Sequence, residues 1–262
     1  MKAYFENEMH EKLYYELENN NSKVLAIMVP GFKSDKDMPL FKKIGEDLSV
    51  DYLRIDFSGC GESDGNYSHS TIKKQVNELC LFIKKMNYEK IILIGHSMGC
   101  TVSIIASQFS KKIASLILIN PLVFPYLTFN DSLIKFSPYV VLRKFNPENN
   151  TIYDRFKKLK ETKEKIITKI KKEVMGREMF EEMKTLDVMC IAKKINLPVF
   201  IIHGRKDELI PLSHAQYINF NVKNSQLAIL NYFHSPFAEN EINEVSKQTL
   251  SFIKILKEKF LK

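Results

Sequence analysis

The pattern with the clearest chemical meaning is Gly95-His96-Ser97-Met98-Gly99, which follows the apolar run Ile91–Ile94. Glycines on both sides of a serine are typical of a sharp turn between a buried strand and a helix, because side chains there would collide with nearby backbone. Such a turn presents the serine hydroxyl as a nucleophile. A glycine-bracketed turn with an incidental serine is the structural alternative. The pattern predicts nucleophilic chemistry at Ser97.

A serine hydroxyl is a weak nucleophile at neutral pH, so it needs a general base and an acid that orients the base. Asp207 follows the apolar run Val199–Ile202, and His234 follows the apolar run Leu227–Leu230. The order serine, acid, histidine is the one that accompanies this kind of turn. Doubly wound sheets build their sites in loops after strand ends. We therefore predict Asp207 as the acid and His234 as the base.

Other residues could take these two roles. Glu208 is the neighbour of Asp207, and Asp187 is a further carboxylate in the preceding region. Among the histidines, His96 lies inside the turn, where a supporting role is expected, and His203 ends a strand and is expected to be packed. The remaining three are expected at the surface: His10, His69 and His214.

The negative charge that develops on a substrate oxygen needs two backbone N–H donors. Met98 directly follows the nucleophile and is expected to supply one. The other is expected from Phe32, in the loop after the apolar run Val24–Val29, where Gly31 would let the backbone approach the substrate closely. A simple turn at Gly31 is the alternative.

Short runs rich in isoleucine, valine and leucine indicate the elements that position these residues. Continuous hydrophobicity is typical of strands covered on both faces, as in a parallel sheet. The runs are Val24–Val29, Tyr52–Ile55, Ile91–Ile94, Leu116–Ile119, Val199–Ile202 and Leu227–Leu230.

Helical patterns lie between most of these runs. The clearest is an apolar stripe formed by Ile72, Val76, Leu79 and Ile83, and a second helix is expected at Thr101–Phe109. The alternation of strands and helices predicts an α/β fold with a doubly wound, mostly parallel sheet. The segments Ala3–Phe5 and Leu13–Leu17 predict an antiparallel hairpin at its edge.

The strand pattern stops between residues 122 and 196, and helical patterns replace it. We expect residues 1–121 and 197–262 to form one core, with a helical cap inserted at 122–196.

Within this cap, residues 157–172 are rich in lysine and have a helical pattern with an apolar stripe. A basic amphipathic helix of this kind can lie on an anionic membrane. We favour the alternative that the apolar stripe of this helix packs onto the core, so that the helix and residues 122–136 together cover the site.

Composition excludes several classes. The 262 residues are 45% hydrophobic and 27% charged, which is ordinary for a folded globular protein. The net charge of +8 comes without a nucleic-acid recognition motif, so we expect a lysine-rich surface and no nucleic-acid partner. The four separated cysteines predict neither disulfides nor a zinc site. Without an apolar leader or a membrane span, a cytoplasmic location is expected.

Three stretches together resemble the α/β-hydrolase superfamily, in particular the carboxylesterases that include cinnamoyl (feruloyl) esterases and monoacylglycerol lipases. They are the serine turn GHSMG at Gly95–Gly99, the stretch RIDFSGCGESDG at Arg54–Gly65, and the loop HGRKDELIP at His203–Pro211, which contains the predicted acid. Two positions depart from the group: Pro30 stands before Gly31 where histidine is usual, and Cys100 follows Gly99 where another glycine is common. We expect Cys100 to be structural.

The resemblance implies a serine hydrolase that cleaves small-molecule carboxylic esters of short or medium acyl groups without a metal or organic cofactor. Monoacylglycerol lipase and acyl thioesterase activities are the alternatives among enzymes. A catalytically silent, hydrolase-like binding protein is the alternative outside them. The oligomeric state is not predicted.

Overall fold

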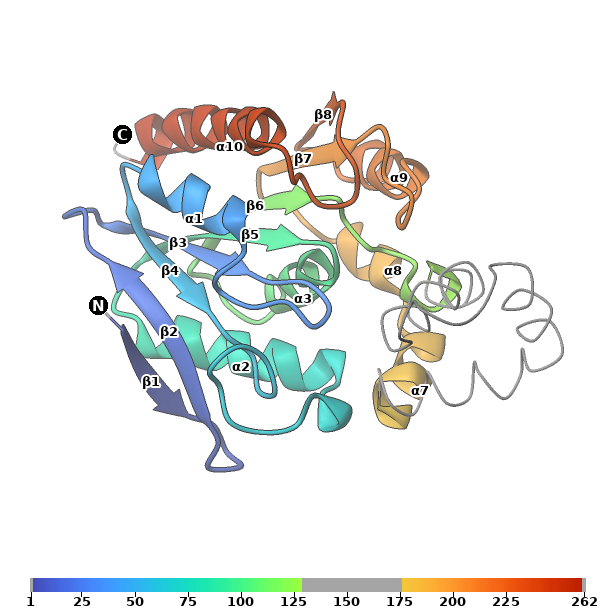
Figure 1. The fold of residues 1–262 in the computed structure, drawn as a ribbon. Coiled ribbons are helices and arrows are strands. Elements are labelled where there is room, and N and C mark those ends of the chain that lie inside the picture. The colour runs from blue at the N-terminus through green and yellow to red at the C-terminus, as the bar shows by residue number, and fades with distance from the viewer. Residues whose placement is uncertain (1, 129–175, 261–262) are drawn as a thin grey trace, which may run out of the picture.

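A computed structural model describes residues 2–128 and 176–260 of the chain. Within them, eight strands form one sheet in the order β1-β2-β4-β3-β5-β6-β7-β8 (Figure 1). Strand β2 is antiparallel to both its neighbours, and the other neighbouring pairs are parallel. The strands are β1 Lys2–Glu6, β2 Lys12–Glu18, β3 Val24–Val29, β4 Asp51–Ile55, β5 Lys90–His96, β6 Ile113–Ile119, β7 Val199–Gly204 and β8 Ser225–Leu230.

The parallel register brings the carboxyl ends of the central strands to one edge of the sheet. Val29 at the end of β3 pairs with Gly95 of β5, and His96 pairs with Ile119 at the end of β6. Gly204 at the end of β7 likewise pairs with Leu230 of β8. The loops that follow these strands, which carry the predicted site residues, therefore start from the same edge.

Helices cover both faces of the sheet (Figure 1). On one face, α1 (Pro39–Glu46) and α10 (Glu239–Phe260) pack together over one apolar core. The other face carries a second core with helices α2 Ile72–Lys85, α3 Met98–Ala106, α7 Arg177–Thr185, α8 Val188–Ala192 and α9 Ser213–Asn221, and with the short 3₁₀ helix η1 Tyr67–His69. This two-faced covering explains why the central strands are continuously apolar. The predicted α/β fold and its doubly wound, mostly parallel sheet are confirmed.

Helix α2 shows how the sequence sets a local boundary. The Thr71 hydroxyl accepts a hydrogen bond from the Lys74 N–H at 3.0 Å, which satisfies one of the N–H groups left open at a helix start. The predicted stripe of four apolar residues is buried against the sheet. Each such side chain contributes roughly 1.5–3 kcal/mol when it is removed from water.

Helix α3 begins at Met98, three residues before the predicted start at Thr101, and ends at Ala106 rather than Phe109. The helix starts directly after Ser97 because the unusual backbone of that residue turns the chain from β5 into the helix within one residue. Glycine has low helix propensity, so the sequence pattern around Gly99 did not indicate that the helix starts this early.

Residues 129–175 lie outside the described part of the chain, so the cap expected at 122–196 stays a prediction. The lysine-rich stretch 157–172 and most of the roof expected from 122–136 fall in the same gap. The described helix α7 packs against α2, and the carboxylate of Glu182 accepts the N–H groups of Ile72 and Lys73 at 2.6 and 2.8 Å. Helix α8 packs against α3.

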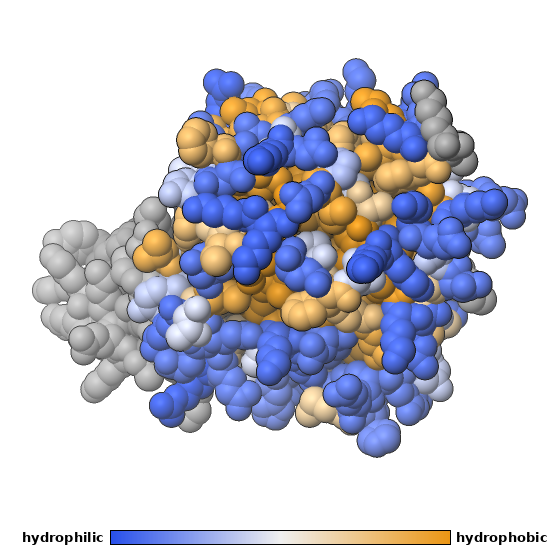
Figure 2. Space-filling view, turned by 180° about the vertical axis from the view of Figure 1, so that it is seen from behind, coloured by the Kyte–Doolittle hydropathy of each residue, from blue (hydrophilic) through white to orange (hydrophobic). Residues whose placement is uncertain are grey.

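The face seen in Figure 2 carries hydrophilic side chains that are spread over the surface, with apolar areas between them. The hydrophilic side chains on this face are therefore dispersed rather than gathered into one continuous patch. Such a distribution is typical of a solvated surface.

Candidate active site

Ser97 occupies the turn between β5 and α3. Its φ of 54° and ψ of −119° lie outside the regions that residues with a side chain normally adopt. The turn is held on both sides, because the Ser97 N–H donates to the Ile119 carbonyl at 2.9 Å and the Ser97 carbonyl accepts from the Cys100 N–H at 3.0 Å. The residue is buried, with 8% of its surface exposed. The strained backbone is therefore fixed by hydrogen bonds to neighbouring elements.

The predicted glycines stand where the backbone passes close to other atoms. A Cβ atom at Gly99 would lie 2.1 Å from the Val29 carbonyl oxygen, which is closer than any side chain allows. One at Gly95 would lie 2.8 Å from the backbone of the following helix. At Gly31 it would lie 3.1 Å from the Cβ of Ser97. The loop after β3 therefore runs directly beside Ser97.

Two hydrogen bonds join the three predicted site residues into one chain. His234 Nε2 lies 3.0 Å from Ser97 Oγ, and His234 Nδ1 lies 2.9 Å from Asp207 Oδ2. The Asp207 side chain is fully buried, and the His234 side chain is 11% exposed. The base thus faces the serine with one ring nitrogen and the acid with the other.

The environment of Asp207 favours its ionised form. Burial by itself would raise the pKa of this carboxyl, but the hydrogen bond from His234 and those from the N–H groups of Leu209 and Ile210 outweigh it, so the pKa is lowered. Neither alternative acid has this setting: Glu208 is exposed, and Asp187 caps helix α8.

Three other histidines are buried near the site. His96 Nε2 lies 3.1 Å from the His234 carbonyl oxygen, and burial lowers the pKa of His96 to about 4. His203 is 0% exposed, as expected for a packed strand residue.

The prediction that His214 lies at the surface is wrong. The residue is 5% exposed, because its ring packs on Phe124 and its Nδ1 accepts the Val123 N–H. His10 and His69 are exposed, as expected.

Met98 and Phe32 are the expected oxyanion donors. Met98 is the first residue of α3, and the first N–H groups of a helix have no partner within the helix. Phe32 follows Gly31 in the loop beside Ser97, and its ring packs edge-on against Tyr67 at 5.2 Å. The hydroxyl of Tyr67 also accepts the N–H of Lys33. The loop is thus held from the side of η1.

The far end of this loop is fixed by Lys36, which the sequence analysis did not single out. Its N–H donates to Asp56 Oδ1 at 2.7 Å, and its ammonium group lies 3.3 Å from Asp56 Oδ2 and 2.6 Å from a Glu62 oxygen. Burial lowers the pKa of Lys36, but these partners together with Asp37 outweigh burial and raise it. Asp56 and Glu62 belong to the Arg54–Gly65 stretch, which is the only sequence signal for this cluster.

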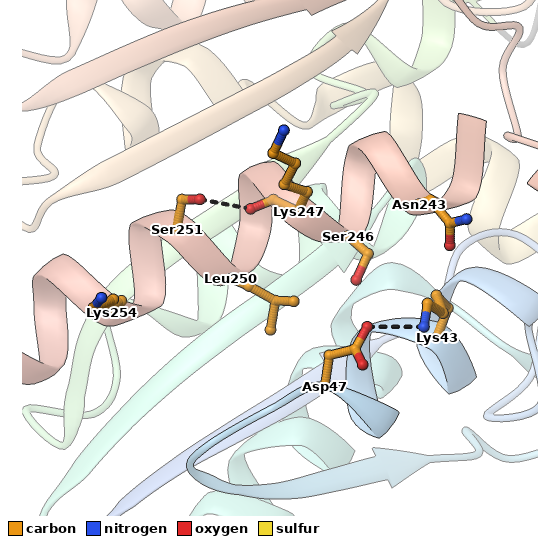
Figure 3. Close-up of a pocket in the computed structure, with 8 residues that line it drawn as sticks. All are labelled: Lys43, Asp47, Asn243, Ser246, Lys247, Leu250, Ser251 and Lys254. Atoms are coloured by element: carbon orange, nitrogen blue, oxygen red, sulfur yellow. Dashed lines mark hydrogen bonds and ion pairs between the residues drawn. The ribbon is translucent and has the colours of Figure 1, made fainter. Parts of the chain in front are cut away.

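An open pocket of about 500 Å³ lies elsewhere, between α1 and α10 (Figure 3). It is lined by Lys43, Asp47, Asn243, Ser246, Lys247, Leu250, Ser251 and Lys254. None of these residues belongs to the site around Ser97.

Within residues 2–128 and 176–260, no group of three histidine, cysteine, aspartate or glutamate side chains could hold a metal ion. In the same ranges no helix combines the length and the apolar character needed to cross a membrane.

Comparison with known proteins gives relatives of low identity. The chain is 24% identical over 217 residues to human "Palmitoyl-protein thioesterase ABHD10, mitochondrial", a match that covers 80% of this chain and 65% of that protein. The chain thus spans just under two thirds of the length of this relative.

Solved structures show the same fold. The chain is similar to mouse alpha/beta hydrolase domain-containing protein 10, with a TM-score of 0.74 and 17% identity over 98% of this chain and 99% of that one. It is also similar to Est1E from Butyrivibrio proteoclasticus with bound ferulic acid, with a TM-score of 0.71 and 22% identity over 99% of this chain and all of that one. Because residues 27–241 match the family described as alpha/beta hydrolase fold, the chain belongs to that family.

Proposed function

We propose that this hydrolase cleaves small-molecule carboxylic esters through an acyl-enzyme on Ser97. His234 removes the proton from the Ser97 hydroxyl as its oxygen attacks the ester carbonyl, and Asp207 stabilises the resulting imidazolium. His234 then gives the proton to the leaving alcohol. Water, activated by His234 in the same way, releases the carboxylic acid and restores the serine. Each turnover thus adds one water across the ester bond.

The observation that carries the proposal is the pair of hydrogen bonds from Ser97 to His234 and from His234 to Asp207, at 3.0 and 2.9 Å. This geometry lets one imidazole accept the serine proton on Nε2 while Nδ1–H stays bonded to the acid. The N–H groups of Phe32 and Met98 are proposed to hold the oxyanion, since Met98 directly follows the nucleophile and Phe32 follows Gly31 in the loop that runs beside it.

We further propose short or medium acyl groups as the preferred substrates. Helix α7 buries Met179, Phe180 and Met183, so the apolar face of this described part of the insertion is used inward rather than offered to lipid. An acyl thioesterase is the second candidate, favoured by the similarity to the human palmitoyl-protein thioesterase. The same serine chemistry serves both ester classes.

The proposal predicts that a fluorophosphonate probe adds covalently to Ser97 alone. Intact mass and peptide mapping locate the label. Ser97→Ala should abolish labelling, whereas Ser107→Ala, at the other end of α3, should label like the wild type. Label that persists in Ser97→Ala or maps to Cys100 would contradict the assignment. A chain that neither labels nor hydrolyses any ester would instead be a hydrolase-like binding protein.

Substrate class is tested with nitrophenyl esters from acetyl to palmitoyl, together with a feruloyl ester, a monoacylglycerol and an acyl thioester. The expected result is the highest kcat/KM for dissolved esters of short or medium acyl groups. A higher kcat/KM for the thioester would establish the second candidate. Activity that rises only above the solubility limit of a long-chain substrate would indicate a lipase.

A further inference from the structure

Asn120, which the sequence analysis did not single out, joins the loops of the proposed acid and base at the strand end next to the nucleophile. It directly follows β6, is 0% exposed, and has a φ of 48°, a conformation that asparagine tolerates better than most residues. The preceding carbonyl, that of Ile119, accepts the N–H of Ser97. Two consecutive residues therefore link β6 to the nucleophile on one side and to the acid and base loops on the other.

The side-chain amide of Asn120 makes four hydrogen bonds to the strand ends next to it. Its Oδ1 accepts the N–H of Gly204 at 2.8 Å and the hydroxyl of Tyr232 at 2.9 Å. Its Nδ2 donates to the carbonyl oxygens of His234 at 2.6 Å and Phe233 at 3.3 Å. Gly204 is the last residue of β7, directly before the loop of Asp207, and the other three partners belong to the loop of the base.

These partners determine both the residue type and its orientation. A primary amide has two N–H donors and an oxygen with two lone pairs, so all of its hydrogen-bonding capacity is used here. The orientation is fixed because the Gly204 N–H needs an acceptor while two carbonyls need donors. An aspartate carboxylate of the same shape could accept from Gly204 and Tyr232, but its second oxygen would face two carbonyl oxygens.

We propose that Asn120 is a positioning residue that holds the backbone of His234 and the start of the Asp207 loop in register with Ser97. This inference rests on the proposed function. The His234 carbonyl accepts from Asn120 Nδ2 and has His96 Nε2 3.1 Å away, so the base is held through its own main chain. Without the amide, the two backbone loops would be free to shift, and the 3.0 Å approach of His234 to Ser97 would lengthen.

The test compares Asn120→Asp and Tyr232→Phe with a matched control, Ser115→Ala. Ser115 is also on β6, is 0% exposed, and donates to the Pro198 carbonyl at 2.8 Å, so its loss removes a buried hydrogen bond at the opposite end of the strand. Esterase kinetics, the rate of fluorophosphonate labelling and the melting temperature are measured for each variant.

Asn120→Asp should lower kcat and the labelling rate about 10- to 100-fold, because a small displacement of a catalytic group is costly. Tyr232→Phe removes one of the four bonds and should lower kcat roughly three- to tenfold. KM should stay within about threefold for both, since neither side chain is proposed to bind substrate. Ser115→Ala should lower the melting temperature and leave kcat unchanged.

Kinetics of Asn120→Asp and Tyr232→Phe that match those of Ser115→Ala would overturn the inference, because Asn120 would then be an ordinary structural residue. If Asn120→Asp does not fold, Tyr232→Phe decides alone by the same comparison. A wild-type chain that neither labels nor hydrolyses esters would contradict the proposed function, and the positioning role with it. A wild-type chain that is active beside variants with unchanged kcat contradicts the positioning role only.

Discussion

The two carboxylate oxygens of Asp207 have different partners. Oδ2 faces His234, and Oδ1 accepts the N–H groups of Leu209 and Ile210. The backbone bonds fix the rotation of the carboxylate, so only one oxygen can meet the histidine ring. This arrangement sets the tautomer that leaves His234 Nε2 free to accept the serine proton.

We predict that Asp207→Asn lowers kcat by a large factor, up to ~10⁴, while KM stays within about threefold. The amide has the shape of the carboxylate but does not hold the histidine in the required tautomer or stabilise its positive charge. Steady-state kinetics with a nitrophenyl ester measure the effect. The exposed neighbour provides the control, and Glu208→Gln should change kcat less than about twofold. The reverse ranking of the two variants would identify Glu208 as the acid.

At the scale of the element, helix α10 carries a polar group inside its buried face. The face includes Val245, Thr249 and Phe252, and the Thr249 hydroxyl donates to the Val245 carbonyl one turn earlier at 2.9 Å. Ser246 is 1% exposed, and its hydroxyl has no hydrogen-bond partner within the described residues. Figure 3 shows it beside the open pocket between α1 and α10. A buried hydroxyl without a partner costs stability.

Ser246→Ala should therefore raise the free energy of unfolding by about 1 kcal/mol, because it removes the buried hydroxyl and introduces a better helix former. Urea denaturation measures the change. The matched control is Ser251→Ala on the same helix, where an exposed hydroxyl donates to the Lys247 carbonyl, and a change within about 0.5 kcal/mol is expected. A Ser246→Ala variant less stable than the wild type would show that this hydroxyl has a partner in solution.

At the scale of the whole molecule, buried histidines make stability depend on pH. Burial lowers the pKa values of His96 and His214 from 6.5 to about 4. Below a pH of about 6.5 these two histidines bind protons in the unfolded chain but stay neutral in the folded chain. Their contribution to the stability of the fold is therefore fully present above this pH and is lost as the pH falls to about 4. The pKa of Asp207 is also lowered, and its contribution is lost at still lower pH.

The expected loss is at most roughly 3 kcal/mol for each of the two histidines. His214→Gln should reduce the loss between pH values of about 6.5 and 4, because glutamine does not titrate there. Urea denaturation across this range gives the slope. Ser107→Ala at the end of α3 provides the control and should keep the wild-type slope, because neither serine nor alanine titrates in this range. Equal slopes for the wild type and His214→Gln would refute the contribution of this histidine.

The sequence by itself predicted the elements whose patterns are local. The continuous apolar runs matched the six strands from β3 to β8 to within a few residues, and the 4-3-4 spacing predicted α2. It also predicted the three side chains that the structure joins by hydrogen bonds, because the glycine-bracketed serine is a local pattern and the two loops after strand ends lie at a shared sheet edge.

Tertiary structure alone decided which polar groups hold those three residues. Asn120 and Lys36 have no distinctive sequence neighbours, and each has partners from loops far along the chain, such as His234 for Asn120 and Glu62 for Lys36. The burial of His214 likewise depends on Phe124, 90 positions earlier. Apolar periodicity records only whether a residue faces a core. The pairing of one donor with one acceptor depends on strand order and register, which arise only when the whole sheet has formed.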